Sequence, residues 1–491
     1  MPAEGRPLDF VDVTLRDGHQ CLWATRMPTS MMVPVARRMD MLGFKAIDLM
    51  GALQFEVCVR YLRENPWDRI RLMRDSIRRT PLNGFVRSKS LISFNLVPDE
   101  VIELWIRRLA ANGIDRLTLF DALFDLDNLA RSIRIASEVG MYTVGALVYS
   151  LSPVHTDELF ARKAQEFVAL GVDAVLLKDP SGLLTPERVR TVVPAIQSTL
   201  AGRALEIHSH CTTGLAPIAY VEAIRLGVDA VQTAISPLAN GHSLPPTERI
   251  AAFANRLNRP VNLDGAGLEE MAVYFERAAV AAGKPLGKPL EYDPRQYEHQ
   301  IPGGMMANLR AQLSQIGLEH KLDEILEEAA RVREELGYIN MVTPTSQLVG
   351  TQAVINVVQG ERYRTMPDEV IRYALGHYGK PLAPLAPDVL DRIHQTPAAR
   401  LYTSREPEKS VIERVRARFG GKISDEDVLL RIMIPEEHVE AMLAAPPLAG
   451  HPPSVATPLV DLVRALVTER RFASVRLETP EVQVTARARR A

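Results

Sequence analysis

The chain is poor in the features that mark several special classes of protein. Its 491 residues include only three cysteines, which are too few and too scattered for a disulfide framework. The 58 basic and 60 acidic residues give a net charge of −2, without the basic excess that typifies nucleic-acid binding. No uninterrupted apolar stretch reaches about 18 residues, so we expect no membrane span. The cysteines are Cys21, Cys58 and Cys211.

The opening residues, MPAEGRPLDF, also lack the apolar segment of a secretory signal peptide. Together with the scarcity of cysteine, this predicts a cytoplasmic protein. The length exceeds that of one ordinary domain, so two or three domains are expected.

Eight strand-like runs alternate with helical patterns in the first part of the chain. Their spacing is roughly 25–40 residues, the length of one βα unit. Eight such units favour a TIM (β/α)8 barrel over residues 1–290, and the pattern alone leaves an open doubly wound sheet as the alternative. The expected strands are residues 10–17, 45–51, 83–87, 115–122, 142–150, 174–182, 205–211 and 230–237.

Beyond about residue 290 the strand signal fades and helical periodicity takes over. Helices are expected within 306–336, over 343–358 after a Thr/Ser cluster, and over 366–379 before a glycine. The composition therefore predicts three further segments. They are a helical domain at 291–442, a Pro/Ala/Gly linker at 443–458, and a tail of one helix and two short strands at 459–491.

Four polar residues at the ends of strand-like runs give the clearest functional signal. They are Asp17 in DVTLRDGHQ, Lys178 in VLLKDPSG, and His208 and His210 in EIHSHC. Strand ends converge on one face of a barrel, and the His-x-His spacing places both imidazoles on the same side of a strand. Two imidazoles and a carboxylate suit a divalent transition metal such as zinc. The simpler alternatives are two structural histidines and a lysine that merely pairs with Asp179.

Five longer segments give a further signal: LRDGHQCLWATRM, LLKDPSGLL, IHSHCTTG, IPGGMMANLRAQL and INMVTPTSQLVGTQAVINVVQGERY. Together they resemble the biotin-dependent carboxyltransferases. This family includes the oxaloacetate decarboxylase α subunit, the metal-binding subunit of transcarboxylase and the pyruvate carboxylase B subunit. The resemblance covers about residues 8–435 and implies a metal-binding barrel with a helical funnel above it. It also implies transfer of CO2 between carboxybiotin and the α-carbon of a ketone through an enolate.

The resemblance also assigns roles to individual residues. It implies that the metal ligands are Asp17, His208, His210 and a carbamylated Lys178, with zinc expected and manganese or cobalt as alternatives. A carbamate is anionic and offers oxygen to a cation, whereas a lysine ammonium would be repelled. The further residues implied are Arg16, Gln20 and Arg87, with Lys178, as catalytic groups, and Ser243 in the substrate pocket.

The chain departs from the family pattern around the expected acceptor pocket. After the third strand the family reads Arg-Gly-x-Asn and then Gly-Tyr, but this chain has Ser88 after Arg87 and Phe94 in place of the tyrosine. Phe124 replaces an asparagine and Glu56 an aspartate. Lost hydrogen-bonding groups weaken the recognition of a polar substrate. This predicts a ketone less polar than pyruvate, including an aryl methyl ketone, although neutral drift in a pyruvate enzyme remains an open alternative.

The expected partners follow from what the chain does not contain. No Met-Lys-Met biotin-acceptor segment is present, so biotin is expected on a separate carrier chain. The tail resembles the segment that precedes the biotinyl domain in biotin carboxyl carrier proteins, and a helix-hairpin this small buries little apolar surface alone. We therefore expect it to pair with another chain or pack on the funnel. A biotin carboxylase, a carrier protein and a homodimer or higher oligomer are the expected assembly.

Two other classes of function share part of this pattern. Claisen-type lyases and synthases have the same opening and a His-x-His strand, but usually continue with Asn-Asp, where this chain has Cys211-Thr212. A catalytically silent assembly subunit is the third class, and its metal ligands need not be intact.

Overall fold

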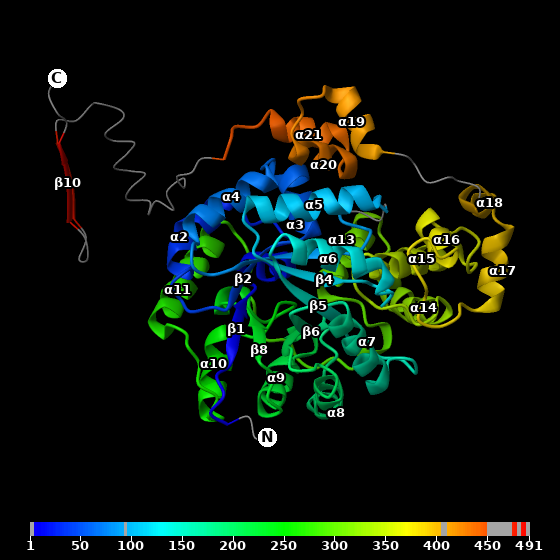
Figure 1. The fold of residues 1–491 in the computed structure, drawn as a ribbon, viewed down its shortest axis with the longest axis horizontal. Helices are drawn as coiled ribbons and strands as arrows, with labels where there is room; N and C mark the ends of the chain where they lie inside the picture. The colour runs from blue at the N-terminus through cyan, green and yellow to red at the C-terminus, as the bar shows by residue number, and fades with distance from the viewer. Residues whose placement is uncertain (1–3, 93–95, 404–409, 449–473, 479–482, 488–491) are drawn as a thin grey trace.

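The structure is a computed structural model that describes residues 4–92, 96–403, 410–448, 474–478 and 483–487. Eight parallel strands close into a barrel in chain order, with β1 paired to both β2 and β8 (Figure 1). This confirms the predicted (β/α)8 barrel and excludes the open sheet. The strands are β1 (Asp9–Asp12), β2 (Ala46–Met50), β3 (Leu82–Arg87), β4 (Arg116–Phe120), β5 (Tyr142–Val148), β6 (Ala174–Asp179), β7 (Ala204–Ser209) and β8 (Ala230–Thr233).

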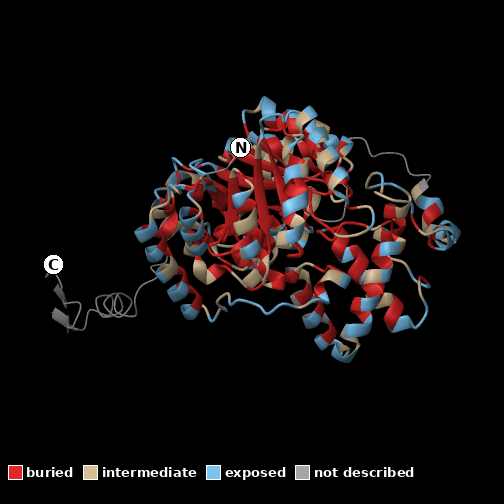
Figure 2. Ribbon diagram, turned by 90° about the horizontal axis from the view of Figure 1, so that it is seen from below, coloured by how far each residue is buried: buried red, intermediate tan, exposed pale blue. Residues whose placement is uncertain are grey.

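The barrel helices cover the strands with their apolar faces, so the strands form the buried interior (Figure 2). In α6, for example, the buried Leu129, Ile133 and Ala136 recur at helical spacing. Thr156 and Thr185 cap the helices that follow them by accepting a backbone N–H. The main helices of this layer are α2 (Thr29–Met39), α4 (Pro66–Ser76), α5 (Asp99–Asn112), α6 (Asp127–Glu138), α7 (Asp157–Ala169), α8 (Pro186–Gln197), α9 (Ala216–Arg225), α10 (Thr247–Arg256) and α11 (Gly265–Ala281).

Several strands end earlier than the sequence predicts, and the first shows why. The predicted strand 10–17 stops at Asp12, and Thr14–Gly18 form a single π-helical turn, η1. The Asp12 carboxylate accepts hydrogen bonds from the Thr14 hydroxyl at 2.6 Å and the Thr14 N–H at 3.2 Å. These bonds turn the chain out of the sheet. Asp17 therefore stands on a turn above the barrel rather than on a strand, and the short α1 (His19–Leu22) follows it.

The helices after α11 form two groups (Figure 1). The first group has its own apolar core, to which Ile325 and Ala329 of α14 and Val349 and Ala353 of α15 contribute. One stretch predicted as helical, 306–336, is divided by a turn at Gly317, where φ is +69°. The helices of this group are α12 (Gln296–His299), α13 (Gly303–Gln315), α14 (Leu322–Glu335), α15 (Thr345–Gln359), α16 (Asp368–Ala374), α17 (Pro387–Gln395) and α18 (Pro397–Thr403).

The second group lies on the outside of the barrel. It consists of α19 (Val411–Phe419), α20 (Asp425–Met433) and α21 (Glu436–Leu443). Leu429 and Leu430 of α20 belong to the barrel core, and Glu426 forms an ion pair with Arg108 of α5.

In the tail, β9 (Ser474–Glu478) and β10 (Gln483–Arg487) pair antiparallel, in the two segments where short strands are predicted. The helix predicted between them and the linker lies outside the described residues.

Candidate metal centre

Three potential metal ligands meet at the carboxyl ends of the barrel strands. Asp17 lies in the η1 turn and His208 in β7, and His210 is the first residue after β7. The two histidine Nε2 atoms are 3.1 Å apart. Asp17 Oδ2 lies 3.2 Å from His208 Nε2 and 3.7 Å from His210 Nε2. All three side chains are buried, and their donor atoms lie within 4.8 Å of one another. The residues predicted from two separate segments are thus brought together.

Hydrogen bonds on the far side of each imidazole fix its tautomer. His208 Nδ1 lies 2.8 Å from Gln232 Oε1, and His210 Nδ1 lies 2.7 Å from the backbone carbonyl of His242. Because a carbonyl oxygen only accepts, each Nδ1 carries the proton and each Nε2 keeps its lone pair. Two lone pairs therefore face each other beside a carboxylate. This is an arrangement that a shared cation stabilises.

Lys178 joins this cluster from β6, directly opposite His208 in the strand register. Its Nζ is 3.1 Å from His208 Nε2 and 3.9 Å from Asp17 Oδ2. Asp179 instead faces the other side of the strand, where it accepts hydrogen bonds from Leu184 N and Ser209 Oγ. A simple Lys178–Asp179 pair, one of the alternatives from the sequence, is therefore wrong.

The electrostatics of the cluster fit a divalent cation. Burial lowers the pKa of His208 to about 3 and that of His210 to about 4, so both imidazoles are neutral near pH 7. Burial would raise the pKa of Asp17, but Arg16 and the neighbouring cluster groups hold it well below its usual range. The buried Asp17 Oδ2 has no hydrogen-bond partner within the described chain. An ionised carboxylate and neutral imidazoles are the ligand forms that zinc takes.

An aromatic wall and a second cation flank the cluster. Arg16 Nη2 lies 2.8 Å from Asp17 Oδ2, and Arg16 Nε donates to the buried Asp48. The Phe85 ring lies 4.2 Å from the Arg16 guanidinium and 5.1 Å from Lys178 Nζ. These contacts place Arg16 and Lys178 on one side of a shared site, with the ring as its apolar wall.

The other predicted catalytic residue of the η1–α1 segment, Gln20, lies in α1, directly after the η1 turn. Its Oε1 accepts a hydrogen bond from Gln54 Nε2 at 3.0 Å, and the same Gln54 amide approaches the Arg16 carbonyl at 3.3 Å. Gln54 thus links Gln20 to Arg16, and the structure brings both to the metal cluster's side of the barrel.

Arg87 and Glu56 lie farther out on the rim. Arg87 follows Phe85 by two residues on β3 and so faces the same side of the sheet. Its Nη2 donates to the Ile92 carbonyl at 2.5 Å. Burial lowers the pKa of Arg87 to about 10, against the opposing effect of Glu56. Glu56 itself pairs with Arg60 at 2.6 Å.

Ser243 is related to the cluster through the backbone. It is buried, its Oγ has no partner in the described chain, and its carbonyl accepts from Cys211 N at 2.7 Å. Its neighbour His242 supplies the carbonyl that orients His210. The contacts thus place Ser243 beside a residue that orients the candidate ligand His210.

The two phenylalanine substitutions have different outcomes. Phe94 lies outside the described residues. Phe124 packs edge-on against Phe160, with 6.0 Å between ring centroids, in the layer between the barrel and α7. The Asp121 carboxylate accepts from the N–H groups of Leu123 and Asp125 and so turns the chain, which leaves Phe124 at φ +57° and directed into this core. The expectation that Phe124 lines the pocket at the metal cluster is therefore corrected: its contacts are those of a core residue.

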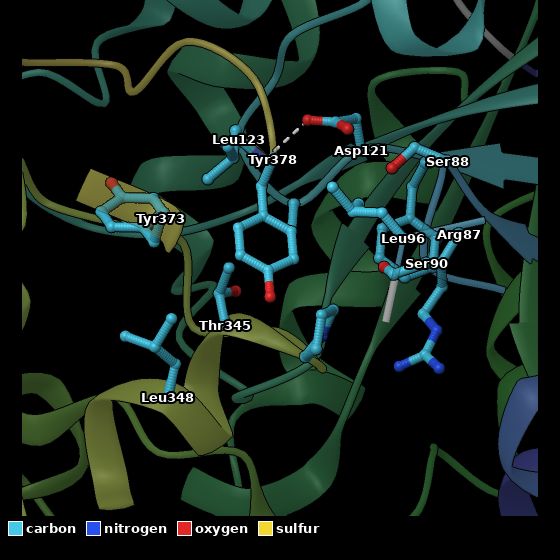
Figure 3. Close-up of a pocket in the computed structure, with 13 residues that line it drawn as sticks. Arg87, Ser88, Ser90, Leu96, Asp121, Leu123, Thr345, Leu348, Tyr373 and Tyr378 are labelled. Carbon is cyan, nitrogen blue, oxygen red and sulfur yellow. Dashed lines mark hydrogen bonds between the residues drawn. The ribbon is translucent and has the colours of Figure 1, made fainter. Parts of the chain in front are cut away.

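A narrow cavity separates the barrel rim from α15 and α16 (Figure 3). Tyr378 lies near its centre, while the guanidinium of Arg87 points away. The buried Tyr378 hydroxyl has no partner in the described chain. The cavity encloses about 20 Å³ of free space, enough for one water molecule. Its walls also include Ser88, Leu96, Phe120, Asp121, Leu123, Thr345, Leu348 and Tyr373.

Three residues of the site escape sequence reasoning: Asp48, Glu206 and Gln232. Each is a polar residue inside an otherwise apolar strand, and each is fully or almost fully buried. That contrast is a usable signal, since a buried polar group needs a partner. The sequence does not reveal which partner each one takes.

The comparisons with known proteins agree with this geometry. A family model described as "Conserved carboxylase domain" matches residues 297–450. The chain is 39% identical to the pyruvate carboxylase B subunit of Methanocaldococcus jannaschii, covering 87% of this chain and 76% of that protein. It is 34% identical to the methylmalonyl-CoA carboxyltransferase 5S subunit of Propionibacterium freudenreichii subsp. shermanii, covering 88% and 87%. It is 32% identical to the 2-oxoglutarate carboxylase large subunit of Hydrogenobacter thermophilus, covering 91% and 70%.

Solved structures show the same architecture. The carboxyl transferase domain of Rhizobium etli pyruvate carboxylase, with oxamate and biotin, superposes with a TM-score of 0.82 at 25% identity. The match covers 90% of this chain and 78% of that one.

Fold and site together define a (β/α)8-barrel enzyme with a candidate divalent-cation site at the strand ends. The chain belongs to the biotin-dependent carboxyltransferases, and it is an enzyme subunit of a carboxylase complex. This membership replaces the Claisen-type and silent-subunit alternatives. Among the described residues, no helix is both long and apolar enough to cross a bilayer.

Proposed function

We propose that this chain transfers CO2 from carboxybiotin, carried on a separate chain, to the α-carbon of a ketone. The observation that carries the proposal is the convergence of two imidazole lone pairs and the Asp17 carboxylate beside Lys178. Asp17, His208 and His210 would hold a divalent metal, zinc by ligand type. When bound, the metal supplies a Lewis acid that stabilises negative charge on the enolate oxygen of the acceptor.

Lys178 is proposed to complete this ligand set as a carbamate. Burial lowers its pKa to about 8, so roughly a tenth of the side chain is an uncharged amine at pH 7, far more than for an exposed lysine. The amine lone pair can attack the carbon of CO2, and the displaced N–H proton passes to solvent. The product is an anion that a cation attracts, whereas the ammonium form would oppose cation binding.

The remaining residues are proposed to position the acceptor. Arg16 is held between Asp17 and Asp48, so its guanidinium is fixed beside the cation site. Phe85 excludes water from that side and leaves the charges in a low-dielectric setting, where they act more strongly. Gln20 and Arg87 are proposed to contact the acceptor from the rim.

A small 2-oxo acid such as pyruvate is the first candidate acceptor. In the reverse direction, the corresponding carboxyl donor would be oxaloacetate. Arg16 and Arg87 offer positive charge for its carboxylate, and the relatives named above include a pyruvate and a 2-oxoglutarate carboxylase. A less polar methyl ketone, aryl ketones included, is the second candidate, supported by the Phe85 wall. Phe124 no longer contributes to that second case, because its ring belongs to the core.

A substrate panel tests the proposal. The chain would be combined with a biotin carboxylase, a biotinyl carrier, ATP and labelled bicarbonate, and then given pyruvate, larger 2-oxo acids, and aliphatic and aryl methyl ketones. We expect label in at least one ketone only when all three proteins are present. A preference for pyruvate above about tenfold, roughly 1.4 kcal/mol in the barrier, would reject the less polar acceptor. Absence of labelled product from every ketone would reject the function.

The assembly and location are proposed alongside the reaction. Three of the relatives described above are named as subunits, which supports partner subunits for this chain. We propose a biotin carboxylase, a carrier protein, an oligomer of this chain and a cytoplasmic location.

We further propose that the tail from about residue 458 aids docking. A chain truncated at about 445 should then assemble more weakly with both partners in sedimentation velocity. Equal assembly and equal turnover of the truncated and full chains would remove the tail from this role.

A further inference from the structure

A buried chain of polar groups runs through the barrel interior and ends on one metal ligand. Arg116 of β4 pairs with the Glu206 carboxylate of β7. Gln232 of β8 donates from Nε2 to Glu206 Oε2 at 3.3 Å, and its Oε1 lies 2.8 Å from His208 Nδ1. None of these side chains is more than 3% exposed. Burying so many polar groups is costly unless each one is oriented correctly.

The chemistry of this chain permits only one orientation of the Gln232 amide. The Glu206 carboxylate, paired with Arg116, can only accept hydrogen bonds. Gln232 must therefore turn its NH2 group toward Glu206 and its carbonyl oxygen toward His208. That carbonyl in turn requires the His208 proton to be on Nδ1, which leaves the Nε2 lone pair in the cluster.

The opposite orientation would block the site. If Gln232 presented its NH2 group to His208, then Nδ1 would become an acceptor and the proton would move to Nε2. This proton would then point at His210 Nε2, 3.1 Å away, and occupy the space of the cation. His210 does not share this dependence, because its Nδ1 partner is a backbone carbonyl that no substitution removes.

We propose that Gln232, held by Glu206 and Arg116, is a positioning residue that fixes the tautomer of His208 and thereby sets the affinity for the divalent cation. The inference rests on the metal site of the proposed function and adds to it the side chains that decide whether the site is preformed. Groups that orient a ligating histidine typically contribute about 10- to 100-fold in metal affinity.

The test compares Gln232→Met, which removes the acceptor at similar volume, with the charge-exchanged pair Gln232→Glu/Glu206→Gln. In the double variant a carboxylate accepts directly from His208, and the new amide bridges it to Arg116. Dissociation constants for Zn²⁺ and Co²⁺ would be measured by chelator competition, with the visible spectrum of the Co²⁺ protein as a report of ligand geometry. Thr143→Val is the control, since it also deletes a buried polar group, the hydroxyl bonded to Asp173, but in a different strand.

We expect Gln232→Met to weaken binding about 10- to 100-fold and to change the Co²⁺ spectrum. Gln232→Glu alone should bind poorly because two carboxylates then face each other, and Glu206→Gln in the same chain should restore affinity to about the wild-type level. Thr143→Val should bind like wild type, and the unfolding temperature of each metal-free variant separates lost ligands from lost folding. Binding by Gln232→Met within about twofold of wild type, or a double variant no tighter than Gln232→Met, would overturn the inference while leaving the metal site intact. Failure of the wild-type chain to bind either metal would overturn the proposed function as well.

Discussion

The barrel interior and the helical core beside it bury their polar groups for different purposes. In the first helical group, Glu328 accepts from Asn356 and Arg362, so its charge is satisfied by neighbours within the same layer. In the barrel, by contrast, the Nε2 atoms of His208 and His210 lie 3.1 Å apart, and both face the Asp17 carboxylate at 3.2 and 3.7 Å. The first arrangement satisfies a buried charge with its neighbours, whereas the second brings candidate ligand atoms together, as the proposed cation site requires.

The pKa values of two buried carboxyl groups of the barrel show how neighbouring cations control ionisation. Burial raises the pKa of Asp12 to about 7, yet Asp17 in the same barrel has its pKa held well below its usual range by Arg16 and the cluster. Two equally buried carboxyl groups therefore have pKa values shifted in opposite directions, because only Asp17 has cations beside it.

The largest effect should come from removing both imidazoles. His208→Ala/His210→Ala deletes two of the proposed ligands, and we expect loss of nearly all bound metal and a drop in carboxyl transfer on the order of 1,000-fold, about 4 kcal/mol in the barrier. Metal content by elemental analysis and label transfer are the measurements. Stoichiometric metal in the double variant would show that the ligands lie elsewhere.

Substitutions of Lys178 should distinguish a role for its positive charge from a role for its carbamate. Lys178→Arg keeps a cation that cannot form a carbamate, and we expect metal affinity and transfer to fall together by about 100-fold or more. Lys178→Glu supplies a carboxylate in place of the carbamate and should retain more metal than Lys178→Arg. The order would be reversed if the positive charge, rather than an anionic ligand, were the functional group.

The metal-free barrel should be sensitive to acid. His208 and His210 have folded pKa values of about 3 and 4, below the ordinary 6.5, so the unfolded chain binds more protons in this range. Stability should therefore fall as the pH drops from about 6.5 to about 4, by a few kcal/mol in total. Urea unfolding at several pH values measures this. His208→Gln should reduce the dependence of the unfolding free energy on pH. The control His394→Gln, at an exposed position on α17, should leave that dependence unchanged.

A substitution in the apolar core of the first helical group should lower the stability of the protein without changing its metal affinity. Ile325→Ala opens a cavity in that core and should cost about 2–5 kcal/mol. Because this core is separate from the apolar core of the barrel that holds the ligands, the metal dissociation constant of the folded variant should stay within about twofold of wild type. A parallel loss of metal affinity would mean that the two regions are energetically coupled and that the contrast drawn above is too sharp.

Sequence periodicity predicts the barrel and the ligands for a clear physical reason. The carboxyl ends of the strands meet on one face of a barrel whatever the conformation of the loops. Two residues in His-x-His spacing face the same side of a strand whichever strands pair with it. Asp17 is predicted correctly as a member of the cluster, although its strand is not, because the Asp12–Thr14 hydrogen bonds that end β1 depend on local side-chain geometry.

The contacts between strands are harder to predict. That Gln232 reaches both Glu206 and His208 depends on the register in which β8 closes against β7, and a single sequence does not fix that register. Phe124 shows the complementary error. Its position in the chain suggests the pocket, but a backbone turn around Asp121 with positive φ directs its ring into the core.

The most direct test of the central claim is metal add-back to the stripped enzyme. The chain would be freed of metal by a chelator and then titrated with Zn²⁺ or Mn²⁺, while label transfer from a carboxylated carrier to a ketone acceptor and bound metal are measured in the same samples. We predict that transfer is absent at the start and rises in proportion to bound metal until about one ion per chain is reached. Full transfer by the metal-free chain would contradict the account.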